Sequence, residues 1–213
     1  MKARPAKAPR IPPYPGLAVE ADEVVWDGRF PVQRVRFTYA RFDGTRSAPL
    51  TWELWRRGPA VAMLPYDPRR DRVALIEQFR LPALAAGQPP ILREAPAGLI
   101  EPGEDPEAAG RREVQEETGL TLGRVESLGD YLLMQGGCDE TIALYVAEAD
   151  LPDAAAAGAT HGLAAEGEDI RLLILPAEDA FALIEAQALR NATAALCLMW
   201  LRHHRARLRE EWR

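Results

Sequence analysis

The acidic stretch that begins at Gly98 contains the residues best suited to chemistry. It reads GLIEPGEDPEAAGRREVQEETGL. Residues three and four apart share one face of a helix, so Glu113 would lie beside both Glu116 and Glu117. Three carboxylates at this spacing repel one another unless a cation lies among them. Oxygen ligands without a nearby His or Cys favour Mg²⁺ or Mn²⁺, and Mg²⁺ is commonly held by carboxylates together with substrate phosphates. The pattern predicts a divalent-metal site that acts on a phosphate compound.

The residues around these glutamates predict a short helix with a defined start and end. Asp105 suits the N-cap, Pro106 suits the first helical position, and Gly119 suits the residue that ends the helix. We therefore expect a helix from Pro106 to Thr118. The alternative interpretation is that its glutamates form the solvated side of an amphipathic helix, as most runs of charge do.

The same segment resembles the Nudix box. Gly98 is followed after five residues by Glu104, and after seven more by REVQEETGL, so every defining position is matched. A pattern with this many fixed positions is far more specific than a single glycine motif. The resemblance implies an α/β fold, a Nudix α/β/α sandwich around a mixed β-sheet, with a small N-terminal antiparallel β domain. It also implies Mg²⁺-dependent hydrolysis of a nucleoside diphosphate linked to another group.

Segments outside the box resemble those of the bacterial ADP-ribose pyrophosphatases and related nucleoside diphosphate sugar hydrolases. They are LPYDPRRDRVALIEQFR before the box, and HGLAAEGEDIR and NATAAL after it. This resemblance implies hydrolysis of ADP-ribose to AMP and ribose 5-phosphate, with a loop glutamate as the base for an activated water. One alternative is hydrolysis of another nucleoside diphosphate sugar such as GDP-mannose. Another is a non-catalytic nucleotide-sensing module, which replaced box glutamates would favour, although none is replaced.

The resemblance also implies roles for residues of the box and of a long loop before the run IRLLIL. Two acidic residues of this loop, Glu166 and Glu168, could each accept a proton from the attacking water, and Glu166 ranks slightly ahead as the base. The alternative is that the loop is acidic only because it is solvated. The implied metal ligands are Ala97 through its carbonyl, Glu113, Glu117 and Glu168, and the implied catalytic residues are Glu166, Glu168 and Glu116.

A second set of residues is implied to bind the substrate. Arg80 resembles an arginine that contacts the diphosphate, a suitable role for a forked and permanently charged donor, although a surface salt bridge is the alternative. Arg112 is expected to orient a box glutamate rather than touch the substrate. The implied substrate-binding residues are Arg29, Phe30, Trp52, Glu53, Arg80, Gly98, Leu99 and Glu140.

Three positions depart from the pattern of the ADP-ribose enzymes. Gln135 stands where a proline is usual, Arg29 where an aromatic residue is frequent, and Trp52 where an arginine is expected. Tryptophan and arginine both stack on π faces, so an exchange of the two partners could preserve a sandwich around a base. It could equally indicate another nucleotide. The alternative for Trp52 and Trp55 is that they share one strand face and pack in a core or a dimer interface.

The chain length of 213 residues suits one catalytic domain with an N-terminal addition. We expect a poorly ordered tail over residues 1–16, a β domain over 17–57 with a turn at Asp43 and Gly44, and the catalytic domain over 58–213. The resemblance implies a homodimer that exchanges its N-terminal domains, so that both chains build each active site. Besides the helix at 106–118, the expected strands are 32–42, 49–57, 60–67, 72–79, 125–134, 140–149 and 170–175, and the expected helices are 176–189 and 191–208.

Composition limits the partners and the compartment. A net charge of −6 and a pI near 5.2 argue against a nonspecific nucleic-acid binder, which needs a basic face. The two cysteines lack metal-ligand spacing and make a disulfide framework improbable. No apolar stretch approaches the ~20 residues that cross a bilayer. We expect a cytoplasmic protein with a small-molecule substrate and no membrane partner.

Overall fold

The structure is a computed structural model that describes residues 10–153, 160–163 and 167–212. The chain divides into two compact units. The first comprises the residues up to Gly58 together with Leu132–Thr141, and the second comprises Pro59–Tyr131 and the residues from Ile142 onward. Residues 1–9 of the expected tail lie outside the described part of the chain.

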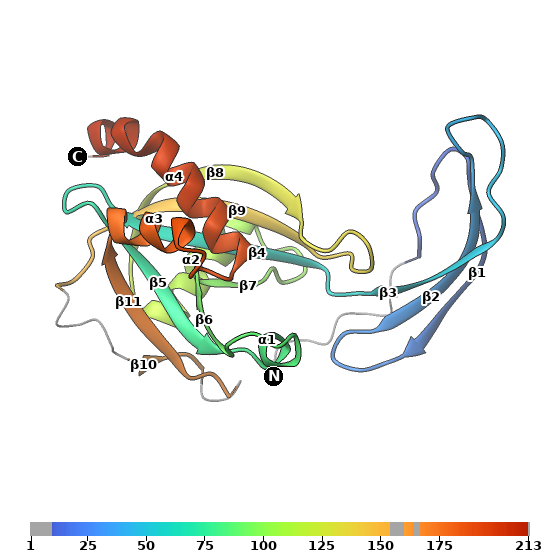
Figure 1. Cartoon of the computed structure of the whole chain (residues 1–213), viewed down its shortest axis with the longest axis horizontal. Helices are drawn as coiled ribbons and strands as arrows, with labels where there is room; N and C mark the ends of the chain where they lie inside the picture. The colour runs from blue at the N-terminus through green and yellow to red at the C-terminus, as the bar shows by residue number, and fades with distance from the viewer. Residues whose placement is uncertain (1–9, 154–159, 164–166, 213) are drawn as a thin grey trace. The chain divides into compact units, whose positions relative to one another are not determined.

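The first unit contains a three-stranded antiparallel sheet in the order β1-β2-β3 (Figure 1). Its strands are β1 (Leu17–Trp26), β2 (Val32–Tyr39) and β3 (Leu50–Trp55). Strands β2 and β3 and the turn between them are confirmed, with Gly44 at a φ of 80°. Strand β1 was not predicted. Its pairing with β2 shifts register twice, and such bulges break the alternation by which a strand is recognised in sequence.

The segment Leu132–Thr141 belongs to this first unit, although it lies inside the region expected to form the catalytic domain. The reason is a set of hydrogen bonds and an ion pair between this segment and the end of β3. The backbone N–H of Trp55 donates to the carbonyl of Gly137 at 2.8 Å, and Trp55 forms a parallel bridge with Cys138. Arg57 forms an ion pair with Glu140 at 2.7 Å. These bonds join two stretches of the chain that are about 80 residues apart.

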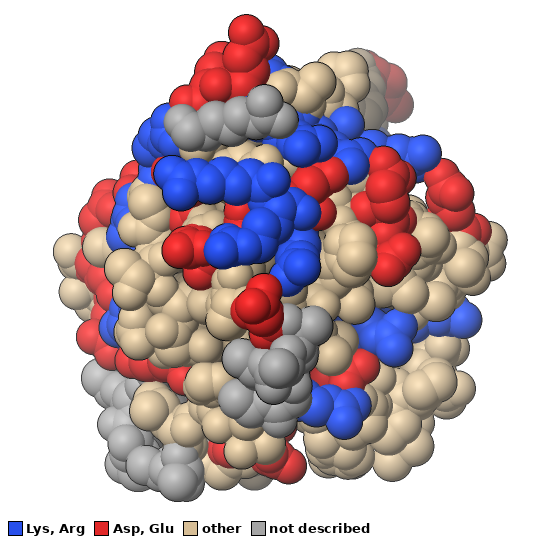
Figure 2. Space-filling view, turned by 90° about the vertical axis from the view of Figure 1, so that its left-hand side faces the viewer, with Lys and Arg blue, Asp and Glu red and all other residues tan. Residues whose placement is uncertain are grey.

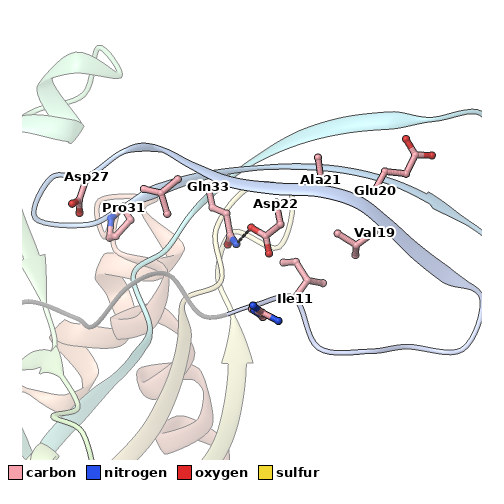
Figure 3. A pocket seen from close by; sticks show the side chains of 10 residues that line it. Ile11, Val19, Glu20, Ala21, Asp22, Asp27, Pro31 and Gln33 are labelled. Carbon is pink, nitrogen blue, oxygen red and sulfur yellow. Dashed lines mark hydrogen bonds between the residues drawn. The ribbon is translucent and has the colours of Figure 1, made fainter.

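A pocket of about 640 Å³ lies on the β1 and β2 side of the first unit (Figure 3). Apolar side chains such as Ile11 and Val19 line it together with Asp22 and Gln33, and the Gln33 amide donates a hydrogen bond to Asp22. It is lined by none of the residues predicted to bind metal or substrate.

The second unit is built on a larger sheet in the order β10-β11-β5-β4-β9-β8, with β6 paired to β5 and β7 paired to β4. The predicted hairpin of β4 and β5 is confirmed by the pairing of Tyr66 with Val73. The strands are β4 (Pro59–Asp67), β5 (Arg72–Phe79), β6 (Ile91–Glu94), β7 (Ala97–Leu99), β8 (Leu122–Leu132), β9 (Thr141–Ala149), β10 (Thr160–His161) and β11 (Ile170–Pro176).

Helices cover both faces of this sheet (Figure 1). Strand side chains alternate between faces, so Val61 and Met63 of β4 pack in the clusters that contain α2 (Pro106–Thr118). Leu64 and Tyr66 instead pack in the cluster that contains α3 (Ala177–Glu185) and α4 (Ala192–Glu211). A short helix α1 (Leu81–Ala85) follows β5 in a segment predicted to be a loop. The α/β/α sandwich with a separate small antiparallel sheet is therefore confirmed.

Ion pairs connect the outer elements of the second unit. Arginine side chains lie beside Asp and Glu side chains on the face shown in Figure 2. Arg124 of β8 makes a two-point pair with Glu148 of β9, with both N···O distances at 2.8 Å, and Arg207 of α4 pairs with Glu126 of β8 at 2.5 Å. Among the residues that the structure describes, none of the helices is long and apolar enough to cross a membrane.

Helix α4 begins at the predicted cap, and its stability should depend on that residue. The side chain of Asn191 accepts a hydrogen bond from the backbone N–H of Ala194 at 2.8 Å. Replacing Asn191 by alanine leaves this N–H without its acceptor, so we expect the free energy of unfolding to fall by ~1 kcal/mol. Urea unfolding measures the loss. The neighbouring exposed Arg190, replaced by alanine, is the control and should leave the unfolding midpoint unchanged.

Candidate active site

Helix α2 positions the glutamates of the acidic stretch as the sequence predicts. The Asp105 side chain accepts a hydrogen bond from the backbone N–H of Ala108 at 3.0 Å, Pro106 opens the helix, and Gly119 ends it at a φ of 70°. One face of α2 packs against β4 and β7. That face carries Glu113 and Glu117, which are only 4% and 3% exposed. Burial of two carboxylates excludes the interpretation that they are simply a solvated surface.

Gly98 lies directly against the carboxylate of Glu113. A Cβ atom at position 98 would lie 2.0 Å from the Cδ atom of Glu113 and 2.1 Å from its Oε1 atom, far inside van der Waals contact. Gly98 is held in place by its pairing with Val61 of β4. Only glycine allows the backbone of β7 to approach the carboxylate this closely.

Glu117 is a buried carboxylate with a strongly raised pKa. Its Oε2 atom accepts a hydrogen bond from the backbone N–H of Ala97 at 3.0 Å. Burial, together with the negative charges of Glu113 and Glu168, raises the pKa of Glu117 to about 8, although the Ala97 N–H and Arg80 oppose the shift. A carboxylate in this situation is stabilised by any additional positive charge.

Arg112 contacts several residues of the box through its guanidinium group. Its Nε and Nη2 atoms donate to the two carboxylate oxygens of Glu104 at 2.9 and 3.0 Å. Its Nη1 atom lies 2.6 Å from Glu113 and 3.5 Å from Glu116, and its Nη2 atom also donates to the carbonyl of Leu99 at 3.2 Å. Arg112 therefore contacts three box glutamates, as its predicted role of orienting one of them requires.

The three box carboxylates lie near one another but have different nearest partners, since Arg112 Nη1 contacts both Glu113 and Glu116 and the charge of Glu113 acts on Glu117. Glu116 is half-buried and has Arg112 as its partner, Glu113 is packed under Gly98 and also pairs with Arg112, and Glu117 is bonded to the backbone N–H of Ala97. Within the described ranges, no group of three or more His, Cys, Asp or Glu side chains is arranged to hold a metal ion. Two buried carboxylates, one with a raised pKa, nevertheless fit a hard dication, because the cation would supply the charge that burial withholds.

Arg80 forms a two-point ion pair, as the alternative of a salt bridge implied, but the sequence did not predict its partner. Its Nε and Nη2 atoms donate to Oε1 and Oε2 of Glu94 at 2.9 and 2.7 Å. The Glu94 side chain is 6% exposed, so the alternative of an ordinary surface salt bridge does not describe this pair. The charges of Glu117 and Glu168 also act on Arg80. Glu94 was missed, although an acidic residue at the end of the short strand β6 was a signal for it.

The two loop acids differ in what the structure describes. The Glu168 carboxylate accepts a hydrogen bond from the backbone N–H of Leu163 at 3.1 Å, and its charge contributes to the raised pKa of Glu117. The structure therefore brings Glu168 into the electrostatic range of the α2 carboxylates. Glu166, the other predicted base, lies outside the described residues.

In the first unit, several of the predicted substrate-binding residues form an aromatic and cationic cluster. Phe30 packs edge-to-face against Trp55 at 5.9 Å between ring centroids. The Arg57 guanidinium lies over both rings, at 4.7 and 4.9 Å, and Arg29 lies 5.5 Å from the Phe30 ring. Arg57 also pairs with Glu140 at 2.7 Å. Sequence reasoning missed Arg57, which joins the predicted Phe30 and Glu140.

Trp52 lies apart from this cluster. Its ring packs edge-to-face against Phe37 at 5.3 Å, and it is 51% exposed, as Glu53 is also exposed. The alternative in which Trp52 and Trp55 share one strand face is wrong, because residues three apart on a strand point to opposite faces. Since both rings are exposed in the chain, neither belongs to its core.

The raised pKa of Glu117 predicts how the stability of the metal-free protein depends on pH. The folded-state pKa of about 8 exceeds the ordinary value of 4.5, so the folded state holds this proton more tightly than the unfolded state does. The free energy of unfolding should therefore fall as pH rises from about 4.5 to about 8, by on the order of a few kcal/mol. Denaturant unfolding in the presence of EDTA measures this. Glu117→Gln should flatten the profile over that interval, and an unchanged slope in the variant would contradict the assignment.

Comparisons with known proteins show the family of this chain. The NUDIX domain profile matches residues 56–196. The chain is 38% identical over 196 residues to an ADP-ribose pyrophosphatase of Escherichia coli strain K12, with 92% of each chain covered. It is 33% identical over 181 residues to a GDP-mannose pyrophosphatase of Citrobacter koseri, covering 84% of this chain and 92% of that protein.

The fold agrees as well. A crystal structure of an ADP compounds hydrolase matches with a TM-score of 0.66 at 22% sequence identity, covering 89% of this chain and 96% of that chain. At this identity the match supports the fold. Together with the complete box from Gly98 to Leu120 and the buried glutamates that α2 positions, the sequence matches identify the family. The chain therefore belongs to the Nudix family of hydrolases.

Proposed function

We propose that this chain hydrolyses the diphosphate bond of nucleoside diphosphate sugars, with ADP-ribose as the substrate that yields AMP and ribose 5-phosphate. The observation that carries the proposal is the buried pair of Glu113 and Glu117 under Gly98, with the pKa of Glu117 raised to about 8. The similarity to ADP-ribose pyrophosphatases over 92% of the chain supports the substrate.

The proposed cofactor is Mg²⁺, with Mn²⁺ as a substitute. When bound, the ion would neutralise the diphosphate and acidify the attacking water. Glu113 and Glu117 would hold it, together with the Ala97 carbonyl and Glu168. These donors are all oxygens, which suits a hard dication.

The remaining proposed steps belong to the protein. Arg80 binds the diphosphate through its guanidinium fork. Either Glu168 or Glu166 accepts the proton of the attacking water, since both precede β11 on the same loop. Glu116 supports the site through its contact with Arg112, which also pairs with Glu113.

We also propose that the protein is a homodimer in which the first unit supplies substrate-binding residues to a partner's site. Three of these residues are exposed in the first unit, namely Arg29, Trp52 and Glu53. Phe30, whose ring lies beside Arg29, and Glu140 would contact the substrate together with them. Analytical ultracentrifugation should give a species near twice 23.5 kDa that resists dilution. A fully active monomer would contradict shared sites.

A substrate panel tests the proposed activity. Purified protein with Mg²⁺ is assayed against ADP-ribose, GDP-mannose and NADH, and the products are identified by mass spectrometry. We expect the highest kcat/KM with ADP-ribose. Preference for GDP-mannose, the substrate named in the second group of relatives, would keep the reaction and change the sugar nucleotide. Absence of turnover with all three would favour a nucleotide-binding role.

A further inference from the structure

The pair formed by Arg80 and Glu94 lies on the same face of the sheet as the buried carboxylates. Ala74 of β5 packs in the cluster that contains Val114 of α2, and Ile76 is in register with Glu94 of β6. Alternate residues of a strand share a face, and Arg80 continues β5 in extended conformation at φ −124° and ψ 100°. Both members of the pair therefore project toward the α2 side, where Glu117 lies.

The geometry of the pair uses only one edge of the guanidinium. Glu94 accepts from Nε and Nη2 of Arg80 at 2.9 and 2.7 Å, which is the side-on edge. An arginine has five N–H groups in a rigid fork. Those on Nη1, and the second N–H of Nη2, have no partner among the residues that the structure describes. They form the end-on edge, which matches two oxygens of a phosphate.

Burial makes Glu94 an effective anchor for this geometry. It is 4% exposed, so its carboxylate has little access to water and depends on Arg80 for its hydrogen bonds. The Arg80 side chain remains 41% exposed, which leaves it accessible to a ligand. One partner is therefore fixed in the protein while the other faces outward.

Two other carboxylates also attract the Arg80 guanidinium. The charges of Glu117 and Glu168 both act on this guanidinium. Without Glu94, the most stable orientation of the Arg80 guanidinium would be toward those carboxylates, because an unpaired charge in a partly buried site is destabilising. Such a turn would remove the end-on edge from the ligand and place a positive charge on the residues proposed to hold the cation.

We propose that Glu94 is a positioning residue that holds the Arg80 guanidinium side-on and thereby leaves its end-on edge for two oxygens of the substrate diphosphate. The inference rests on the proposed function, which assigns the diphosphate to Arg80. It adds a residue outside the Nudix box to the machinery of substrate recognition.

A double-variant cycle tests the inference. The affinity of the Mg²⁺-loaded protein for the nonhydrolysable α,β-methylene analogue of ADP-ribose is measured by calorimetry, and KM for ADP-ribose is measured in parallel. Glu94→Gln keeps the side-chain shape but has one acceptor oxygen, so Kd should rise roughly tenfold to a hundredfold, and Arg80→Ala should do the same. The double variant should be no weaker than Arg80→Ala, because Glu94 acts through Arg80. KM should follow Kd.

Two further variants separate positioning from a structural role. Arg80→Lys keeps the charge and leaves Glu94 in place but lacks the fork, so it should lose affinity as Arg80→Ala does, which keeps the test decisive if Glu94→Gln fails to fold. Glu148→Gln is the matched control, since it breaks the two-point pair with Arg124 between β8 and β9. It should lower thermal stability and leave Kd unchanged.

The outcomes distinguish the inference from the proposed function. Native affinity in Glu94→Gln combined with weak binding in Arg80→Ala would overturn the role of Glu94 alone. If the increases in Kd of the two single variants multiply in the double variant, the role of Glu94 would also be overturned, because Glu94 would then act independently of Arg80. Native affinity in both Arg80→Ala and Arg80→Lys would overturn the inference and also remove the diphosphate contact from the proposed function. If wild type binds the analogue but does not hydrolyse ADP-ribose, that result would contradict only the proposed activity and leave the role of Glu94 in place.

Discussion

Replacing Glu117 by glutamine should lower kcat for ADP-ribose by about a thousandfold or more, since the variant loses a charge worth several kcal/mol at the reacting centre. The side chain is 3% exposed and accepts the Ala97 N–H, so the shape of the site should survive the substitution. The loss should appear in kcat because the cation is needed most where negative charge develops during phosphoryl transfer. Steady-state kinetics at saturating Mg²⁺ measures the effect.

The control for this variant lies on the same helix. Glu107 is in the first turn of α2 and pairs with Arg111 at 2.9 Å, away from the buried face. Glu107→Gln should retain activity near that of wild type. Calorimetry with Mn²⁺ adds a readout that does not depend on turnover, and Glu117→Gln should bind the ion more weakly. Equal kcat in wild type and Glu117→Gln would overturn the assignment of Glu117 as a metal ligand.

Replacing Gly98 by alanine should lower kcat/KM by about a hundredfold, because a shift of the order of 1 Å in a reacting group can cost that much. The added Cβ atom would lie 2.0 Å from the Cδ atom of Glu113, so either the carboxylate or β7 must move. The Glu113 side chain is buried and paired with Arg112 at 2.6 Å, which limits how it can yield. Kinetics and Mn²⁺ affinity should both deteriorate.

Gly110 provides a matched control for this steric effect. A Cβ atom at position 110 of α2 would lie 2.5 Å from the Cε atom of Met63, which is the far end of a flexible side chain. Gly110→Ala should therefore disturb packing and leave most of kcat/KM intact. Similar losses of activity in both variants would indicate that general distortion of α2, rather than displacement of Glu113, causes the effect.

The sequence by itself determined the local structure of the acidic helix. Its start at Pro106 and its end at Thr118 follow from a side-chain cap, a fixed proline φ and a glycine that adopts positive φ, all of which act within a few residues. The β4 and β5 hairpin and the layers around it follow equally from apolar periodicity. The family was also readable, because the box consists of residue types at fixed spacing.

Only the tertiary structure decided which side chains meet. Helical spacing placed Glu113, Glu116 and Glu117 near one another, but the close approach of Gly98, the Ala97 N–H and the reach of Arg112 separated their roles. The position of Trp52 on the opposite side of β3 from Trp55 and the membership of Leu132–Thr141 in the first unit were likewise not predicted.

The partnership of Arg80 with Glu94 shows the physical reason. The two residues are 14 positions apart and meet because β6 pairs with β5, with Ile76 in register with Glu94. Local propensity acts over a few residues, whereas burial and strand pairing join distant ones, and a carboxylate becomes an anchor only once the folded chain has removed it from water. The sequence therefore determined which acidic residues the box contains, and the fold decided which of them are buried and which partners hold them.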